Sequence, residues 1–360
     1  MKIKKNFLLL IFFIAIETIF LKTFMYDLLP NKYFLDAGHI LGVMNGIAGT
    51  DKSYSYVASI FNMINVFGFT NIQQWGYLIA MIFVPILIKC ISKYRNYNQV
   101  ELIFIFAAFT LLNIYVFGIS KDIIQFVYFL FIFIILSNKK LKNVSKIILI
   151  CLVLLLEAYF FRIYYAIMAI LIVTIYFIYI NFINEKKVDK KQFVKIIILS
   201  FSLFFLEIYV VQLLSYDNYD AILNARYSVN IWRVNDANAT TIINDLLGQN
   251  TNYLKFIGNY VINFIRLLFP FELIFKGIKQ IIFAIYQIFI TTMLIKSCKK
   301  INYNNCLWII TLLSFIMIST IFEPDFGSFV RHETAAILIV LEVVRCGIND
   351  KKIIRKGDDN

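Results

Sequence analysis

The chain has 360 residues, of which 61% are hydrophobic and only 16% are charged, and its mean hydropathy is +0.77. This composition excludes an ordinary soluble domain and indicates a protein with several membrane-spanning helices. The formal net charge of +13 would suggest nucleic-acid binding in a soluble protein. In a membrane protein, basic residues collect in cytoplasmic loops instead, so we expect no nucleic-acid partner.

Ten apolar segments are candidates to cross the hydrocarbon core of a bilayer. We expect an all-α, polytopic bundle of about ten transmembrane helices that forms a single membrane domain over residues 1–360. The first segment has a basic start like that of a signal peptide, but no small-x-small cleavage site follows it, so we interpret it as an uncleaved span. The predicted spans are 6–25, 73–92, 100–118, 123–137, 147–162, 163–183, 194–214, 280–296, 306–322 and 333–347.

The basic residues indicate that both termini are cytoplasmic. Most of the 35 Lys and Arg residues fall in alternate connections between the predicted spans, as expected for cytoplasmic segments. The opposite, outer face then consists mainly of two long loops, about 26–72 and 215–279, with short turns between the other spans. The basic segments lie at 2–5, 89–95, 139–146, 186–195, 296–300 and 345–356.

Segment 256–275 is apolar enough to be an eleventh span, which would invert the orientation of everything after it. Its polar residues form a single helical stripe, and Pro270 ends the pattern. We therefore interpret the segment as an interfacial or re-entrant helix on the outer face. The stripe consists of Lys255, Asn259, Asn263 and Arg266.

Five arginines fall on the predicted outer face. Arg carries a rigid fork of donors that suits carboxylate and phosphate oxygens, so together they favour an anionic ligand. The alternative is that each Arg pairs with a neighbouring acid and holds a loop in place. The five residues are Arg162, Arg226, Arg233, Arg266 and Arg331.

Two of these arginines, Arg226 and Arg233, are seven residues apart in the second outer loop. A helix through both would direct their side chains the same way. Trp232 and Tyr227 flank them, and aromatic rings beside polar groups suit sugar faces as well as membrane interfaces. The sequence leaves both interpretations open.

The first outer loop places Asp36 and His39 three residues apart, on one face of a predicted helix. Asp36 either caps the N-terminus of this helix or acts as a base that activates a hydroxyl group. The chain has two histidines, His39 and His332. Neither has the ligand spacing typical of a zinc site, so we predict no metal and no cofactor.

The densest cluster of charge is EPDFGSFVRHE, between the last two predicted spans. Pro324 ends the first of these spans and Gly327 permits a tight turn. The turn should therefore fix its charged side chains at the outer end of the bundle, as a catalytic site requires. A purely structural ion pair between Asp325 and Arg331 is the alternative. The charged residues concerned are Glu323, Asp325, Arg331 and His332.

The segment PDFGSFVRHE resembles a motif that precedes the last span of Wzy-type polymerases, which build O-antigen and capsular polysaccharide from repeat units. Three further segments are similar to patches of this family and of the related EpsG-like proteins. They are SKD at 120–122, FRIYY at 161–165 and IRLLFPFELIFKG at 265–277.

This resemblance implies a glycosyltransferase-C-like bundle in the bacterial inner membrane, with an active site that faces the periplasm. The implied reaction transfers a growing glycan from undecaprenyl pyrophosphate to a new lipid-linked repeat unit. The implied partners are the lipid-linked oligosaccharide, the bilayer and a chain-length regulator protein. Fixed cations would stabilise the pyrophosphate leaving group without a required metal, and the acceptor hydroxyl would need a base.

Within this reaction we expect Arg331 to bind the pyrophosphate. The base stays open among Asp325, His332, Asp36 and His39; His332 is favoured because it adjoins Arg331 and titrates near neutral pH. The candidates for substrate binding are Arg162, Arg226, Arg233, Arg266, His39 and Glu323.

Three other functions fit parts of the sequence. A glycosyltransferase that moves one sugar from a polyprenyl phosphate would suit Asp36 equally. A lipid-linked oligosaccharide flippase would need charges that line a cavity across the bilayer, whereas the charges here lie on one face. A membrane acyltransferase would need a His and an acid within an embedded motif, and that signal is weaker here.

Overall fold

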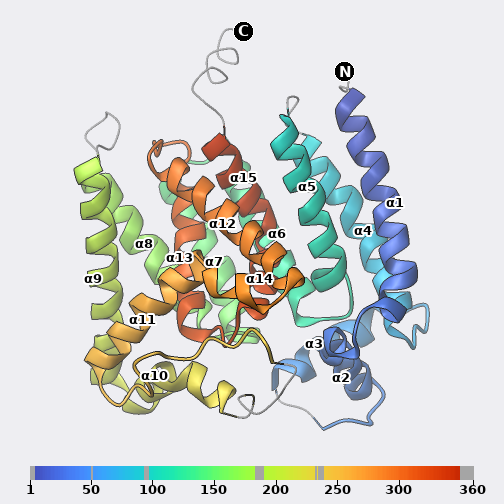
Figure 1. The fold of residues 1–360 in the computed structure, drawn as a ribbon, viewed down its shortest axis with the longest axis horizontal. Coiled ribbons are helices and arrows are strands. Elements are labelled where there is room, and N and C mark those ends of the chain that lie inside the picture. Colours follow the sequence, from blue (N-terminus) through green and yellow to red (C-terminus); the bar gives the residue numbers. More distant parts are fainter. Residues whose placement is uncertain are drawn as a thin grey trace. The chain divides into compact units, whose positions relative to one another are not determined.

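The computed structural model describes residues 5–49, 52–92, 97–182, 190–231, 233 and 239–348 (Figure 1). Helices account for 81% of the structure. Strands do not occur in the described part of the chain, where Ile242 and Asp325 form an isolated bridge. The expected all-α fold is confirmed.

Six of the described helices are long and apolar enough to cross a membrane, and they coincide with six of the ten predicted spans. They confirm a helical, multi-pass membrane protein. The remaining four predicted spans are helical but shorter: α6 (Lys121–Ser137), α8 (Tyr165–Phe182), α13 (Cys306–Phe322) and the successive helices α14 (Phe326–Ala335) and α15 (Ile337–Ile348). The six long helices are Phe7–Leu28, Ile72–Ser92, Gln99–Val116, Asn143–Phe160, Lys195–Leu214 and Ile278–Cys298.

The chain forms two compact units, which are described separately. Unit 1 comprises Met1–Phe131, Tyr159–Arg162 and Arg331–Ile337. Unit 2 comprises Ile132–Ala158, Ile163–Val330 and Leu338–Asn360.

In unit 1, α1 (Lys5–Leu28) packs against α4 (Ile72–Ser92) and α5 (Gln99–Leu111), which continues into the π-helix η2 (Leu112–Val116) (Figure 1). Asn98 and Glu101 form a capping box at the start of α5, which satisfies backbone N–H groups there. The outer loop of this unit folds into two short helices that pack on each other, α2 (Leu35–Met44) and α3 (Lys52–Ile64).

A buried lysine in α1 fixes the turn that precedes α6. The Lys22 ammonium donates to the carbonyl oxygens of Asn113 and Phe117. Helix ends leave such carbonyl groups without partners, and a cation is well suited to satisfy them. The contact therefore ties α1 to the segment that leads into Asp122.

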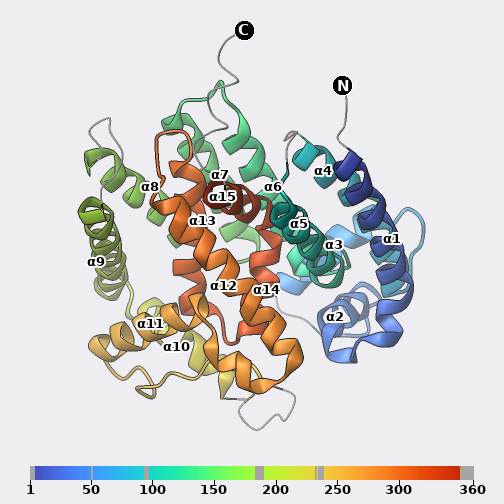
Figure 2. The same ribbon diagram turned by 45° about the horizontal axis from the view of Figure 1, so that its top comes forward.

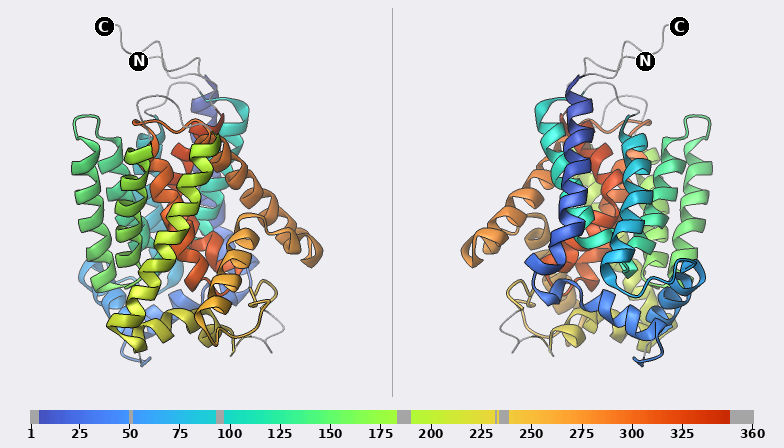
Figure 3. Two further views of the ribbon diagram at one scale, coloured as in Figure 1. Left: turned by 90° about the vertical axis from the view of Figure 1, so that its left-hand side faces the viewer. Right: turned by 90° about the vertical axis from the view of Figure 1, so that its right-hand side faces the viewer.

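In unit 2, α13 packs against α8, and α8 packs against α9 (Lys190–Leu214) (Figure 2). Helix α7 (Asn143–Phe160) completes this layer, and α12 (Ile278–Cys298) runs obliquely to it (Figure 3). Gly347 of α15 is close to α12, since a Cβ there would lie 2.5 Å from the carbonyl oxygen of Met293. Glycine permits this close approach of two backbones.

The second predicted outer loop contains α10 (Tyr216–Asn230), α11 (Tyr253–Leu268) and the 3-10 helix η3 (Phe271–Lys276). Helix α11 ends two residues before Pro270, as predicted, and at 16 residues it is shorter than the roughly 20 that a span requires. Its polar stripe faces the protein, because Asn259 and Asn263 are buried, whereas Leu254 and Ile265 on other faces are exposed.

Three lysines of the predicted cytoplasmic segments, Lys89, Lys146 and Lys300, lie near helix ends that carry no candidate site residue. In unit 1, Lys89 lies in the last turn of α4, at the end opposite to the Lys22 contact. In unit 2, Lys300 donates to the carbonyl of Gly347 near the end of α15, and Lys146 donates to that of Leu136. Parts of the predicted cytoplasmic segments, at 2–4, 93–95, 186–189 and 351–356, lie outside the described residues.

Candidate functional site

The predicted site residues fall into two polar clusters, one in each unit. The turn at 323–332 contributes to both, because Arg331 and His332 bind residues of unit 1, whereas Glu323 and Asp325 bind residues of unit 2. The unit 1 cluster consists of Asp36, Asp122, Arg162, Arg331 and His332. The unit 2 cluster consists of Arg226, Arg233, Asp245, Arg266, Glu323 and Asp325.

Asp122 is the centre of the unit 1 cluster. Its side chain is only 2% exposed, and its Oδ1 lies 3.4 Å from Arg162 Nη2 while its Oδ2 lies 3.2 Å from Arg331 Nε. It stands in the first turn of α6, where backbone N–H groups favour a negative charge. A carboxylate this deeply buried is stable because it is paired with cations. Asp122 thereby fixes two guanidinium groups side by side.

Asp36 binds the exposed side of Arg331. Its Oδ2 lies 3.0 Å from Arg331 Nη1, and both side chains are 32% exposed. Its Oδ1 accepts a hydrogen bond of 2.7 Å from the Tyr54 hydroxyl. The N-cap interpretation of Asp36 is wrong, since Phe34 is the N-cap of α2 and Asp36 stands in the first turn.

The surroundings of Asp36 keep it ionised. Its partial burial alone would raise the pKa of the carboxyl, but the charge of Arg331, the Tyr54 hydrogen bond and the charge of Lys121 together lower that pKa below its usual value. The Lys121 ammonium lies 3.2 Å from the centre of the Tyr54 ring, a cation–π contact. Asp36 is therefore a carboxylate at neutral pH.

His332 contacts both guanidinium groups of the cluster. Its Nε2 lies 2.9 Å from Arg162 Nη2 and 3.5 Å from Arg331 Nη2. The same nitrogen lies 3.4 Å from Asp122 Oδ1. Nε2 accepts from Arg162 when the ring proton is on Nδ1, and it faces Asp122 as a donor when it is itself protonated. In the first case the lone pair that a base would use is bound by Arg162, and in the second it carries a proton, which weakens the expectation that His332 takes the proton.

His39, another predicted candidate for the base, packs against Tyr54, which in turn donates to Asp36. The two rings pack edge to face with their centres 4.5 Å apart. Asp36 and His39 lie on α2 as the sequence predicted, and both contact the same tyrosine of α3.

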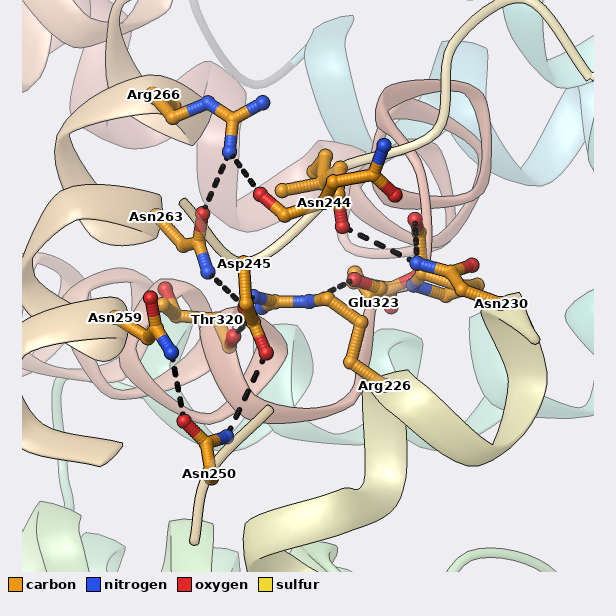
Figure 4. A network of polar contacts seen from close by, with 12 residues as sticks. Arg226, Asn230, Asn244, Asp245, Asn250, Asn259, Asn263, Arg266, Thr320 and Glu323 are labelled. Carbon is orange, nitrogen blue, oxygen red and sulfur yellow. Dashed lines mark hydrogen bonds and ion pairs between the residues drawn. The ribbon is translucent and has the colours of Figure 1, made fainter. Parts of the chain in front are cut away.

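The unit 2 cluster is centred on Arg226 (Figure 4). This arginine is 6% exposed. It donates to Asp245 Oδ1 at 2.9 Å, to the carbonyl oxygen of Glu323 at 3.0 Å and to that of Thr320. Burial lowers its pKa, against the opposing effect of Asp245. Its bonds attach α10 and the loop at Asp245 to the C-terminal end of α13.

Arg233, Arg266 and Asp325 of this cluster also form ion pairs. Arg266 makes two bonds to Glu272, of 2.8 and 3.0 Å. Arg233 lies 2.6 Å from Asp325 Oδ2. The Oδ1 of Asp325 accepts a bond of 2.7 Å from the backbone N–H of Ser328, which makes Asp325 a cap for α14. Asp325 is thus engaged on both oxygens, by a partner other than the predicted Arg331.

The predicted helix through Arg226 and Arg233 is wrong. Helix α10 ends at Asn230, so Arg233 follows the helix and binds a different acid. Trp232, which was expected beside them, lies outside the described residues.

All five outer arginines therefore have carboxylate partners, and the unit 2 set mainly joins loops to helices. Arg226 is the clearest case, because it is buried and binds main-chain carbonyls. Arg331 differs because it is one-third exposed and is held by two carboxylates from separate segments. A cation that is fixed and still accessible is suited to an anionic ligand.

Sequence reasoning did not select Asp122, Gln125, Tyr54 or Asp245. The only feature of the sequence that pointed to Asp122 was the similarity of the SKD segment at 120–122 to a patch of the Wzy-type family. Gln125 lies one turn further along α6 and accepts a bond of 2.5 Å from Arg162. Among the described residues, no group of three or more His, Cys, Asp or Glu side chains is arranged to hold a metal ion.

Comparison of the chain with models of protein families, with curated proteins and with solved structures finds no match. The resemblance to Wzy-type polymerases thus stays a prediction from short motifs.

We expect substitution of the buried Arg226 and of the partly exposed Arg233 to change the stability of the protein to different extents. Arg226→Ala should lower the free energy of unfolding by about 3–5 kcal/mol, because Asp245 loses its cation and the carbonyl groups of Thr320 and Glu323 lose a buried donor. Arg233→Ala should change it by at most about 1 kcal/mol, since the Arg233 side chain is 36% exposed and hydrated. Thermal unfolding of both variants in one detergent measures this difference. Equal shifts would contradict the loop-holding role of Arg226.

Proposed function

We propose that this chain is a membrane glycosyltransferase that polymerises oligosaccharide repeat units carried on undecaprenyl pyrophosphate, with the unit 1 cluster as its reaction centre. It would act in the bacterial inner membrane, as a ten-span bundle of the glycosyltransferase-C kind with its site on the outer face. The observation that carries the proposal is Arg331, held by Asp122 and Asp36 beside Arg162.

The cations of this cluster suit a pyrophosphate leaving group. As the bond between the anomeric carbon and the pyrophosphate oxygen breaks, that oxygen keeps the electron pair and gains negative charge. Guanidinium groups already oriented by Asp122 would stabilise this charge without reorganising. Arg331, the more exposed of the two, would exchange Asp36 for a phosphate oxygen.

A carboxylate of the same cluster suits the acceptor hydroxyl. The acceptor oxygen bonds to the anomeric carbon and loses its proton to a base. We favour Asp36, because it is ionised and one-third exposed, whereas Nε2 of His332 lies between Arg162 and Asp122 in a side chain that is only 11% exposed. When Arg331 binds a phosphate oxygen in place of Asp36, the Oδ2 of Asp36 is released and can accept the proton of the acceptor hydroxyl.

The topology part of the proposal has a direct test. In fusions of a periplasmic and a cytoplasmic reporter, junctions after residues 278 and 303 should report the outer and the cytoplasmic side respectively. The expectation follows because α11 is short and carries a buried polar stripe. If both junctions report the cytoplasmic side, segment 256–275 crosses the membrane and the ten-span layout is wrong.

Arg331→Ala should abolish long polysaccharide chains and retain the lipid-linked single repeat unit. A lost charge-stabilising donor typically lowers the rate by about 10²- to 10³-fold. The measurement is a gel ladder of surface polysaccharide from a deletion strain that carries the variant at normal membrane abundance. Arg331→Lys keeps the charge without the planar fork and should restore the ladder only in part.

A matched control is Lys32→Ala, which removes one positive charge from the same outer loop region and should leave the ladder intact. An unchanged ladder for Arg331→Ala would exclude Arg331 from the reaction. Loss of the single-repeat glycolipid as well would favour transfer of a single sugar from a polyprenyl phosphate.

The pH dependence distinguishes the two bases. With Asp36 as base, activity in proteoliposomes should stay level as the pH falls from about 8 to about 5, because Arg331 and the Tyr54 hydrogen bond, against the effect of burial, hold the pKa of this carboxyl below its usual value. With His332 as base, activity should instead fall as the pH is lowered, because a protonated imidazole cannot accept a proton. A decline near neutral pH that disappears in His332→Gln would contradict the role of Asp36.

A further inference from the structure

Unit 2 contains a cavity of about 340 Å³ between α10 and the loop at 243–249. This volume lies at the lower end of the range of small-molecule sites, about 300–1,000 Å³. None of the residues proposed for the reaction centre lines it. The lining residues that matter here are Arg226, Tyr227, Asn230, Asn244, Asp245 and Gln249.

Most of the lining surface is apolar, and the polar groups on it carry little net charge. Arg226 and Asp245 form an ion pair of 2.9 Å, so their charges largely compensate. The side chains of Asn244 and Gln249 are exposed, and each amide offers both donors and an acceptor. Such a surface is suited to a neutral ligand that is rich in hydroxyl groups.

Tyr227 supplies an apolar surface beside these amides. It lies on α10, one residue after Arg226, and is 39% exposed. An accessible ring next to hydrogen-bonding groups matches a pyranose, which has C–H faces and a rim of hydroxyl groups. The sequence left such a role for Tyr227 open against a membrane interface.

Asn230 adds an unsatisfied acceptor at this cavity. Its Nδ2 donates to the carbonyl oxygens of Ile243 and Pro324 (Figure 4). Its Oδ1 is buried and has no hydrogen-bond partner among the described residues. Buried acceptors without a partner are rare, so a hydroxyl group of a ligand or a water molecule is expected there.

The wall of the cavity is held in place by the unit 2 cluster. Asn259 accepts from the backbone N–H of Leu247 at 2.9 Å and donates to the carbonyl of Gly248 at 2.8 Å. Asn263 donates to Asp245 at 2.6 Å. These bonds fix the loop on which Asn244 and Gln249 stand, and a preorganised wall lowers the cost of binding.

We propose that this cavity is a subsite for one neutral sugar ring of the oligosaccharide substrate, with Tyr227 stacking on the ring and Asn244, Gln249 and Asn230 binding its hydroxyl groups. The identification of that sugar as part of a lipid-linked repeat unit rests on the proposed function. The buried network around Arg226 then has two roles, since it stabilises the second outer loop and shapes the subsite.

The test is binding of sugars to the full chain in lipid nanodiscs, measured by saturation-transfer difference NMR. The probes are a panel of neutral methyl glycosides and a partial acid hydrolysate of the surface polysaccharide of the source cell. Wild-type protein should bind at least one probe. Tyr227→Ala should weaken that binding by about fivefold or more, and Tyr227→Phe should retain it. Gln249→Ala should also weaken it.

The matched control is Tyr216→Ala, which removes another exposed tyrosine of α10 that does not line the cavity and should bind as wild type does. Inorganic phosphate should not compete with the glycoside. The subsite is disproved if no probe binds, if Tyr227→Ala binds like wild type, or if phosphate displaces the sugar.

The two proposals fail separately. Arg331→Ala should still bind the glycoside, because the cavity is intact. If deletion of the gene leaves the polysaccharide ladder unchanged while sugar binding through Tyr227 persists, the polymerase proposal is wrong and the subsite stands. If the ladder depends on Arg331 but Tyr227→Ala binds normally, the subsite is wrong and the polymerase proposal stands.

Discussion

The buried carboxylate of Asp122 is the constraint on which the unit 1 site depends. A 2%-exposed negative charge is stable only when cations surround it, and here Arg162 and Arg331 supply them. The same contacts orient both guanidinium groups before any ligand arrives. The position of Asp122 depends in turn on the turn before α6, which Lys22 fixes by binding Asn113 and Phe117.

The two clusters use the same chemistry to different ends. In unit 2, Arg226 is buried and donates hydrogen bonds to main-chain carbonyls. These bonds attach α10 and a loop to α13, so the role of Arg226 is structural. In unit 1, Arg331 is shared between two carboxylates and stays one-third exposed. Exposure therefore separates Arg331 from the buried Arg226, and its second carboxylate partner separates it from the similarly exposed Arg233.

Several features followed from the sequence because they depend on local patterns. Apolar length predicts helices, and the ten expected segments are helical, six of them long and apolar enough to span a membrane. Pro270 and the spacing of Asn259 and Asn263 indicated a separate amphipathic helix, and α11 is one. The local pattern was misleading at Asp36. Its position in the sequence was compatible with an N-cap, but in the structure it lies in the first turn of α2.

The sequence by itself determined that this is a helical membrane protein, because hydrophobicity and its period are properties of short segments. It also predicted, from the distribution of Lys and Arg, which charged residues lie in the outer loops. Only the tertiary structure decided which acid meets which arginine, since Asp36 and Arg331 are 295 positions apart and Arg233 and Asp325 are 92 apart. Pairings over such separations depend on how the helices pack, and no local spacing encodes them.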